Sequence, residues 1–319
     1  MEIKRSTVGG SVVFLAIIII VFAVLDPFRR DVIIAAACFA LCAASFDYAS
    51  GFAGLRSLGP IIPFGIGAYL NGYLIREGAQ LTLSLPIVFI VTALIGFLLY
   101  RTLIGSREDT STWVVFGLIA SLMLEQFARL SINILGGSNG LIIPRYFGNG
   151  ANSEHDIFLF YGIVLGVLVI GIGYLGYAVY SRRGALLLLL QHDPDRLKAI
   201  GYYPHRKRAI VILQQWGISS IAGAIYVSTV GAVDPSIFGL DNNLTILIAA
   251  VAFGEKSIMR PALAAFCILF FENIAGSIFV GYQTLILGIV FILTLYFYDG
   301  NKLRGDVPRL SLGTFGIRL

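Results

Sequence analysis

The chain has 319 residues, of which 57% are hydrophobic and only 13% are charged. Soluble domains carry about 25% charged residues, so this composition excludes a soluble globular protein and indicates an integral membrane protein. The net charge of +5 belongs to the loops between apolar runs, and no nucleic-acid partner is expected. The three cysteines and three histidines lack metal-ligand spacing, so no metal site is predicted.

The apolar runs are too long, and alternate too little, for the strands of an outer-membrane barrel, and they predict an all-α fold. We expect one transmembrane domain over residues 1–319 with nine or ten spanning helices, because no linker or change of composition divides the chain. The eighth and ninth runs are shorter than the roughly 20 residues of a full crossing and are expected to be tilted, broken or re-entrant. The expected spans are Ser11–Leu25, Asp31–Ser50, Leu58–Ile75, Leu81–Tyr100, Ser111–Ile132, Ile157–Tyr180, Ala209–Val230, Asn243–Phe253, Pro261–Ile274 and Gly276–Tyr298.

The distribution of positive charge predicts the orientation of these spans. If the N-terminus is cytoplasmic, 18 of the 23 Lys and Arg residues fall on the cytoplasmic side and four on the opposite side. Basic loops tend to stay in the cytoplasm, so this distribution predicts cytoplasmic N- and C-termini, with a cytoplasmic tail at about 299–319. We therefore expect a multi-pass protein of the cell (plasma or inner) membrane, in contact with its lipid.

The stretch Gly51–Tyr69 is unusually rich in residues that interrupt helices, since it holds two prolines and five glycines. Two interpretations are open. The stretch is either a kinked helix or a broken one, and broken backbone survives in lipid only where it is buried or lines a cavity. Discontinuous helices near the membrane midplane are where transporters bind polar solutes.

Ionisable residues inside spans are costly, and they are usually paired or functional. Glu125 and Arg129 have the i,i+4 spacing that places an acid and a base on one helix face. They form either a neutralised pair that fixes helix packing or a contact for a substrate. Asp47 and Glu272 lie near span ends and are expected to be partly hydrated. The intramembrane charged residues are therefore Asp47, Glu125, Arg129 and Glu272.

Residues 181–208 form the most basic segment, with seven Lys and Arg residues between two long apolar runs. So dense a polar segment is expected outside the bilayer, on the cytoplasmic side. Asp193 can cap a short helix that starts at Pro194, and Gly201 can end it. The segment is either an ordinary charged loop with a fragment of helix or a helix offered to a cytoplasmic partner.

Several motifs together resemble one transporter family. GFAGLRSLGPIIPFGIGAY (51–69) resembles a signature of permease subunits in the branched-chain amino-acid, urea and amide branch of bacterial and archaeal ABC importers. GGSNGL (136–141) is similar to that family's outer-loop motif, and the segment 182–208 is similar to its coupling segment. GISSIAGAIYVSTVGAVDPSIFG (217–239) resembles the family's following motif. Arg56 and Pro60 depart from the residues common there.

The resemblance implies a permease subunit that moves a small amino-acid-like solute inward by alternating access, either a branched-chain amino acid or urea or a short amide. It implies two cytoplasmic ATPase subunits that hold ATP and Mg, a second permease subunit and an extracytoplasmic solute-binding protein. The chain itself would carry no nucleotide motif, no cofactor and no enzyme activity. The implied ATPase-coupling residues are Asp193, Pro194, Asp195, Arg196, Lys198 and Gly201, and the implied substrate path comprises Gly51, Gly54, Ser57, Gly59, Gly65, Gly67, Asn139 and Gln214.

A different class of function is also open. An autonomous ion-coupled secondary carrier or channel would use Glu125, Arg129 or Asp47 as its ion site. A membrane-embedded enzyme is a weaker alternative, because the sequence has no cluster of His, Cys or acidic residues to carry the chemistry.

Overall fold

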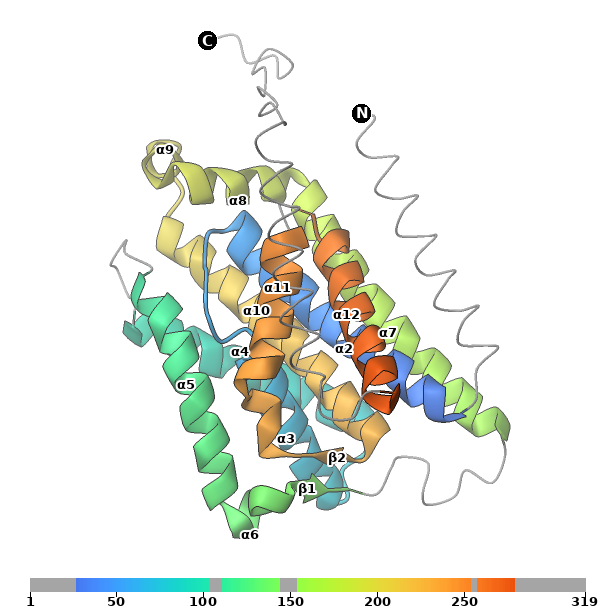
Figure 1. Ribbon diagram of the computed structural model, residues 1–319. Coiled ribbons are helices and arrows are strands. Elements are labelled where there is room, and N and C mark those ends of the chain that lie inside the picture. The colour runs from blue at the N-terminus through green and yellow to red at the C-terminus, as the bar shows by residue number, and fades with distance from the viewer. Residues whose placement is uncertain (1–26, 104–110, 144–153, 254–256, 279–319) are drawn as a thin grey trace.

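The computed structural model describes residues 27–103, 111–143, 154–253 and 257–278 (Figure 1). These residues form a bundle of helices, and their strands are limited to β1 (Leu141–Ile142) and β2 (Ala232–Val233), which pair antiparallel. The chain is therefore an all-α, polytopic membrane protein, as its composition predicts. The first expected span, Ser11–Leu25, the tail at 299–319 and most of the last expected span lie outside the described residues.

The elements follow one another in a simple order along the chain. The α-helices are α2 (Pro27–Asp47), α3 (Ile62–Arg76), α4 (Leu81–Leu103), α5 (Ser111–Leu130), α6 (Ile132–Leu135), α7 (Glu154–Tyr180), α8 (Arg182–His192), α9 (Pro194–Ala199), α10 (Pro204–Val230), α11 (Leu240–Phe253) and α12 (Met259–Ile278). A π-helical turn, η1 (Tyr48–Phe52), extends α2, and two 3₁₀ turns, η2 (Gly137–Asn139) and η3 (Pro235–Phe238), lie in loops.

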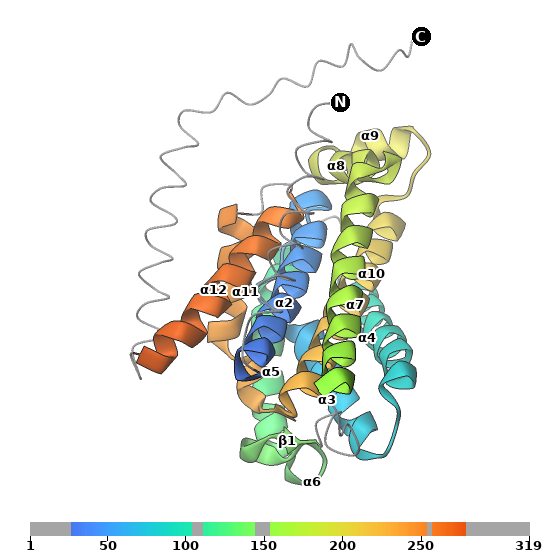
Figure 2. The same cartoon turned by 90° about the vertical axis from the view of Figure 1, so that its right-hand side faces the viewer.

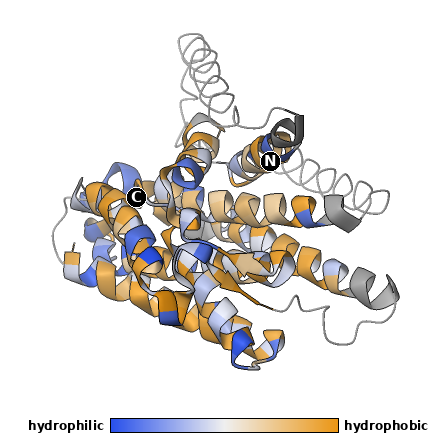
Figure 3. Ribbon diagram, turned by 60° about the horizontal axis from the view of Figure 1, so that its bottom comes forward, coloured by the Kyte–Doolittle hydropathy of each residue, from blue (hydrophilic) through white to orange (hydrophobic). Residues whose placement is uncertain are grey.

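Among the described residues, five helical stretches are long and apolar enough to cross a membrane. They agree with the second, fourth, fifth, sixth and seventh expected spans, and hydrophobic residues cover most of the length of the helices (Figure 3). These five stretches are Asp31–Phe52, Leu81–Leu103, Thr112–Leu130, Phe160–Tyr180 and Pro204–Val230.

Helix α10 lies at the centre of the bundle and packs on α2, α3 and α4. Small residues allow the close approach: a Cβ on Gly67 would lie 2.3 Å from the Ser220 carbonyl oxygen, and one on Gly96 would lie 2.4 Å from the Trp216 ring. Such contacts are typical of helix packing in lipid, where apolar surface alone does not drive association. Helices α4, α5 and α7 keep most of their surface exposed, as expected for helices at the edge of the bundle.

Two expected boundaries were wrong, and one helix was not expected. The third span was expected from Leu58, but α3 begins at Ile62 because the preceding backbone is not helical. The leucine run in the basic segment forms a separate helix, α8. It was not predicted because the segment was interpreted from its charge, with a helix expected only from Pro194. Helix α12 continues without interruption to Ile278, across the boundary expected between Ile274 and Gly276.

The two ends of the bundle carry different features (Figures 1 and 2). Helices α8 and α9 lie at one end, and α6, β1 and β2 lie at the opposite end. Helix α2 runs towards the α8 end, whereas α3 occupies the half of the bundle nearest β1 and β2. The segment that joins α2 to α3 therefore enters the bundle from the α8 end and stops part-way through it.

Candidate functional site

Non-helical backbone separates α2 and its extension η1 from α3. The π-helical turn η1 ends at Phe52, and residues 53–61 are not helical. Gly54 takes a left-handed conformation with φ of 72°, which favours glycine, and it turns the chain back into the bundle. Of the two interpretations of this stretch, the structure therefore shows the broken helix. We call residues 53–61 the break.

The break contacts α5 at a point where two glycines meet. A Cβ on Gly59 would lie 2.2 Å from the Gly117 carbonyl oxygen, and a Cβ on Gly117 would lie 2.1 Å from the Ser57 hydroxyl oxygen. Distances this short leave no room for a side chain at either position. The amide of Leu58 also donates to the carbonyl of Val114, at 3.3 Å. The break is thus seated directly on α5.

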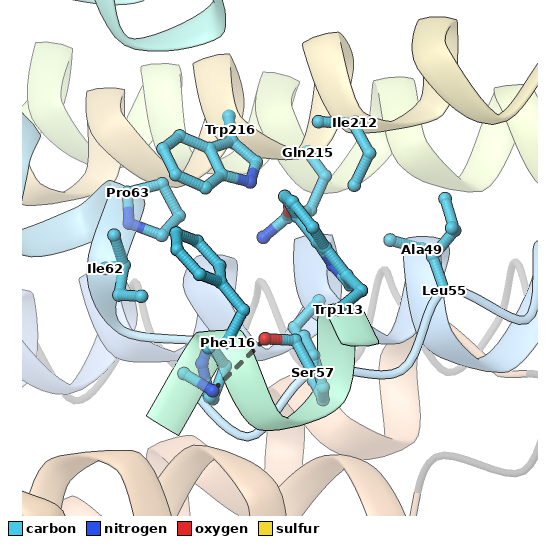
Figure 4. Close-up of a pocket in the computed structure, with 14 residues that line it drawn as sticks. Ala49, Leu55, Ser57, Ile62, Pro63, Trp113, Phe116, Ile212, Gln215 and Trp216 are labelled. Carbon is cyan, nitrogen blue, oxygen red and sulfur yellow. Dashed lines mark hydrogen bonds between the residues drawn. The ribbon is translucent and has the colours of Figure 1, made fainter. Parts of the chain in front are cut away.

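A hollow opens between the break, α5 and α10 (Figure 4). It holds about 370 Å³ of empty space, part of it open to the surroundings, and its wall is mostly aromatic and aliphatic. Polar groups come from Ser57, whose hydroxyl accepts a hydrogen bond from the Gly59 amide at 3.2 Å, and from Gln215. The lining residues are Phe46, Ala49, Leu55, Ser57, Gly59, Pro60, Ile62, Pro63, Trp113, Phe116, Gly117, Ile212, Gln215 and Trp216.

The hollow combines apolar walls with few polar groups, as small-molecule sites usually do. Trp113 and Phe116 project from α5 towards Gln215 and Trp216 on α10, with Ser57 at their base (Figure 4). None of the lining side chains is an acid, a histidine or a cysteine, so the hollow offers no general acid–base pair. Its composition suits passage of a small, partly apolar solute.

Buried hydrogen bonds hold the break in place. The Asn243 side-chain oxygen of α11 accepts from the amide of Ile61, at 3.3 Å, and its nitrogen donates to Ser121 of α5, at 2.6 Å. The Ser121 hydroxyl donates to the carbonyl of Phe238, at 2.6 Å. A helix that begins inside the membrane has backbone amides that lipid cannot satisfy. At the start of α3, Asn243 satisfies one of these, the amide of Ile61. We call Asn243 and Ser121 the polar anchor. Sequence reasoning missed both residues.

The expected substrate-path residues lie in different parts of the structure. Ser57 and Gly59 line the hollow. Four of the glycines lie close to other residues and do not line the hollow. A Cβ added at Gly51 would be nearest to Asp47, one at Gly54 to Gln191, one at Gly65 to Phe238 and one at Gly67 to Ser220. Asn139 is exposed in η2, near β1 and away from the α8 end.

Gln214 bonds to neighbouring helices and does not line the hollow. Its side-chain oxygen accepts from the Tyr48 hydroxyl at 2.6 Å, and its nitrogen donates to the Tyr174 hydroxyl at 2.7 Å. These bonds connect η1, α10 and α7. Its neighbour Gln215 is buried and lines the hollow, because consecutive residues of a helix face different directions.

The intramembrane charges are placed differently from one another. Glu125 and Arg129 form the expected ion pair, with 2.6 Å between Oε1 and Nη2. Glu272 is partly buried on α12. Asp47 is not partly hydrated as expected, since only 2% of it is exposed and its Oδ2 has no hydrogen-bond partner. The η1 turn covers it, with Gly51 against its carboxylate.

The ion pair on α5 gives a testable prediction. Replacing Glu125 with glutamine leaves Arg129 unpaired on a membrane helix and should lower thermal stability, whereas E125Q/R129Q should recover much of the loss because no charge remains. The comparison is the melting temperature of the wild-type, single and double variants in detergent. A double variant less stable than E125Q would contradict a mainly structural pair.

The segment 181–208 contains the expected short helix, α9. The Asp193 carboxylate accepts from the amide of Arg196 at 3.0 Å, Pro194 is the first helical residue, and Gly201 has φ of 85° just after the helix. Lys198 pairs with Asp195 at 3.0 Å; the Asp195 side chain is 81% exposed and that of Lys198 is 42% exposed. Leu197, which is fully buried, fixes α9 to the rest of the protein.

Helix α8 connects α9 to the break. A Cβ added at Gly54 would lie 3.3 Å from the Cγ atom of Gln191 in α8, so the two residues are close neighbours. The Leu190 side chain beside it is fully buried. The chain that carries α9 therefore touches the break, whose other end lines the hollow.

The comparison with known families decides the identity of the chain. A family model described as a branched-chain amino acid transport system / permease component matches residues 29–295. The chain belongs to this permease family. The match covers the break, the hollow and the segment 181–208 of the permease, and it agrees with the resemblance seen in the sequence. Comparisons with curated proteins and with solved structures returned no match.

Within the part of the chain that the structure describes, the permease has no group of three or more His, Cys, Asp or Glu residues that could hold a metal ion. The apparent GxGxxG pattern of Gly171, Gly173 and Gly176 lies inside α7, without the preceding strand that a dinucleotide site requires. Of these glycines only Gly171 packs closely, since a Cβ there would lie 3.0 Å from Leu41.

Proposed function

We propose that this permease is the transmembrane subunit of an ATP-binding-cassette importer for branched-chain amino acids, or for urea or short amides. Separate ATPase subunits, which would hold ATP and Mg, would drive inward movement by alternating access. The observation that carries the proposal is the contact between Gln191 of α8 and Gly54 of the break. It joins α8, which leads to the exposed helix α9 at one end of the bundle, to the break that lines the hollow.

Helix α9 has the form expected of a docking element. It is short, polar and exposed, with side-chain exposures of 81% for Asp195 and 77% for Arg196. Its capped start and glycine end give it a fixed shape before any partner binds, which reduces the entropy lost on binding. In this proposal the α8–α9 end is cytoplasmic and contacts two ATPases, and the β1–β2 end receives a solute-binding protein. A second permease subunit completes the membrane part.

The proposed movement follows the contacts. Closure of the ATPases would displace α9, and α8 would carry the displacement through Gln191 to Gly54. The break would then shift on α5 at Gly59 and Gly117 and change access to the hollow. At this contact neither glycine has a side chain, so backbone lies directly against backbone.

A charge reversal tests the docking role of α9. In D195R/R196D we expect loss of ATPase co-purification and at least about a tenfold decrease in uptake, because charge complementarity steers and orients such contacts. The matched control is R76E/E77R, which reverses an adjacent exposed pair at the end of α3, near β1. Unchanged co-purification and uptake in D195R/R196D would overturn the proposal.

Reconstitution separates the proposal from the autonomous carrier. Vesicles that contain the permease alone should show no gradient-driven uptake of leucine, and uptake should require the ATPase subunits and ATP. Flux through the permease alone would favour the carrier or channel.

A further inference from the structure

Arg208 is an unusual residue in α10. The sequence places it at the end of the basic segment, but the structure places it in the second turn of α10, where only 7% of it is exposed. Its Nε is enclosed without a hydrogen-bond acceptor. Within the described residues the Arg208 guanidinium forms no hydrogen bond and no ion pair. A buried cation without a counter-charge is costly, so such a group is normally paired.

A second unsatisfied donor lies near it. The hydroxyl of Tyr100, in the last turn of α4, is buried and has no hydrogen-bond partner, and only 2% of the residue is exposed. Arg208 is close enough to act electrostatically on this hydroxyl. The two residues come from adjacent helices, since α4 packs along α10. A guanidinium and a phenol therefore share one buried environment, in which no other described residue supplies an anion.

This environment adjoins the hollow. The Tyr100 ring meets Trp113 edge-on, with 6.1 Å between ring centroids, and Trp113 lines the hollow. On α10, Arg208 lies four residues before Ile212 and seven before Gln215, which places all three on one helix face. Ile212 and Gln215 also line the hollow. Arg208 is thus one helical turn beyond the hollow, towards the end that carries α8 and α9.

We infer that Arg208 and Tyr100 form a binding site for the carboxylate of the transported solute, between the hollow and the α8–α9 end of the permease. A carboxylate would supply the missing counter-charge to the guanidinium and accept from the Tyr100 hydroxyl, and charge-assisted bonds of this kind are the strong ones. The apolar part of the solute would remain against Trp113. This inference rests on the proposed transport function.

The site would select by chemical class. A carboxylate satisfies both buried donors, whereas the neutral amide of an otherwise identical solute leaves the guanidinium without a counter-charge. Sites built to bind a polar group discriminate strongly against analogues that lack it, because their own buried groups remain unpaired. The permease should therefore prefer solutes with a free carboxylate to urea or short amides.

The test compares uptake of L-leucine with uptake of L-leucinamide by the complete transporter. In Arg208→Gln we expect leucine uptake to fall by about tenfold or more, with at most about a twofold change for leucinamide, so that the selectivity ratio collapses. Tyr100→Phe removes only the hydroxyl and should reduce the same ratio by a smaller factor. Arg208→Lys keeps the charge and should retain part of the leucine uptake. The matched control is Arg101→Gln, which removes an exposed charge next to Tyr100.

The outcomes separate this inference from the proposed function. If the wild type, supplied with the ATPases and ATP, takes up neither of these solutes nor urea, the proposed function itself is overturned. If the wild type transports leucine, then equal losses for both solutes in Arg208→Gln, or losses no larger than in Arg101→Gln, would overturn the carboxylate site. Wild-type uptake of leucinamide equal to that of leucine would also overturn it. If Arg208→Gln does not accumulate in the membrane, Tyr100→Phe provides the test. If the ratio of leucine to leucinamide uptake is the same in Tyr100→Phe as in the wild type, the carboxylate site is overturned.

Discussion

Replacing Asn243 with leucine is expected to lower the free energy of unfolding by about 2 kcal/mol or more. The substitution removes the acceptor of the Ile61 amide and the donor to Ser121 while keeping a similar side-chain volume. Each buried polar group left unsatisfied costs about 1–3 kcal/mol, and lipid offers no replacement. Unfolding of the purified chain in mixed micelles, followed by circular dichroism, measures the change.

The matched control for this prediction is Asn242→Leu. Asn242 is the preceding residue, and its side chain donates to the Ser236 carbonyl at 3.0 Å in an exposed position, where water can replace the bond. Ser121→Ala should give an intermediate loss, because the Ile61 amide keeps its acceptor. A loss in Asn243→Leu no larger than in Asn242→Leu would show that the polar anchor does not hold the break.

Replacing Gly59 with alanine is expected to reduce uptake by at least about tenfold. A methyl group there would lie 2.2 Å from the Gly117 carbonyl oxygen, far inside van der Waals contact, so the break must move away from α5. Overpacking of this kind costs about 1–3 kcal/mol, and the displacement of the break that restores van der Waals contact alters the wall of the hollow. Uptake should be measured beside the amount of chain in the membrane.

Gly173→Ala is the matched control, since the same change in α7 would meet nothing within 4 Å. Gly117→Ala should reproduce the loss of Gly59→Ala, because its methyl would collide with the Ser57 hydroxyl from the other side. If Gly59→Ala transports as well as Gly173→Ala, the close contact between the break and α5 has no role in transport.

Much of the fold follows from local properties of the sequence. A long apolar run must form a helix in lipid because its backbone can be satisfied only within the segment, and this explains why five expected spans are present. The cap at Asp193, the start at Pro194 and the turn at Gly201 are equally local and were predicted correctly. Helix α8 was missed because the leucine run that forms it lies inside a segment identified by its charge.

The candidate site could be predicted only in part. Ser57 and Gly59 stand out because glycine and proline are unusual in an apolar run, whereas Trp113, Phe116 and Trp216 resemble ordinary membrane-helix residues. Their position around one hollow depends on how α5 and α10 face each other, which no local pattern records. Arg208 was counted as a loop residue for the same reason, because its burial depends on the neighbouring α4.

Sequence patterns alone predict an all-α membrane permease, the positions of most of its apolar helices, and a departure from regular helix in the stretch 51–69. That this departure is a break rather than a kink is visible only in the folded protein. A helix can begin inside a membrane only if its freed backbone groups find partners, and the partner of the Ile61 amide, Asn243, lies 182 residues further along the chain. Only folding brings the two together, and with them the walls of the hollow.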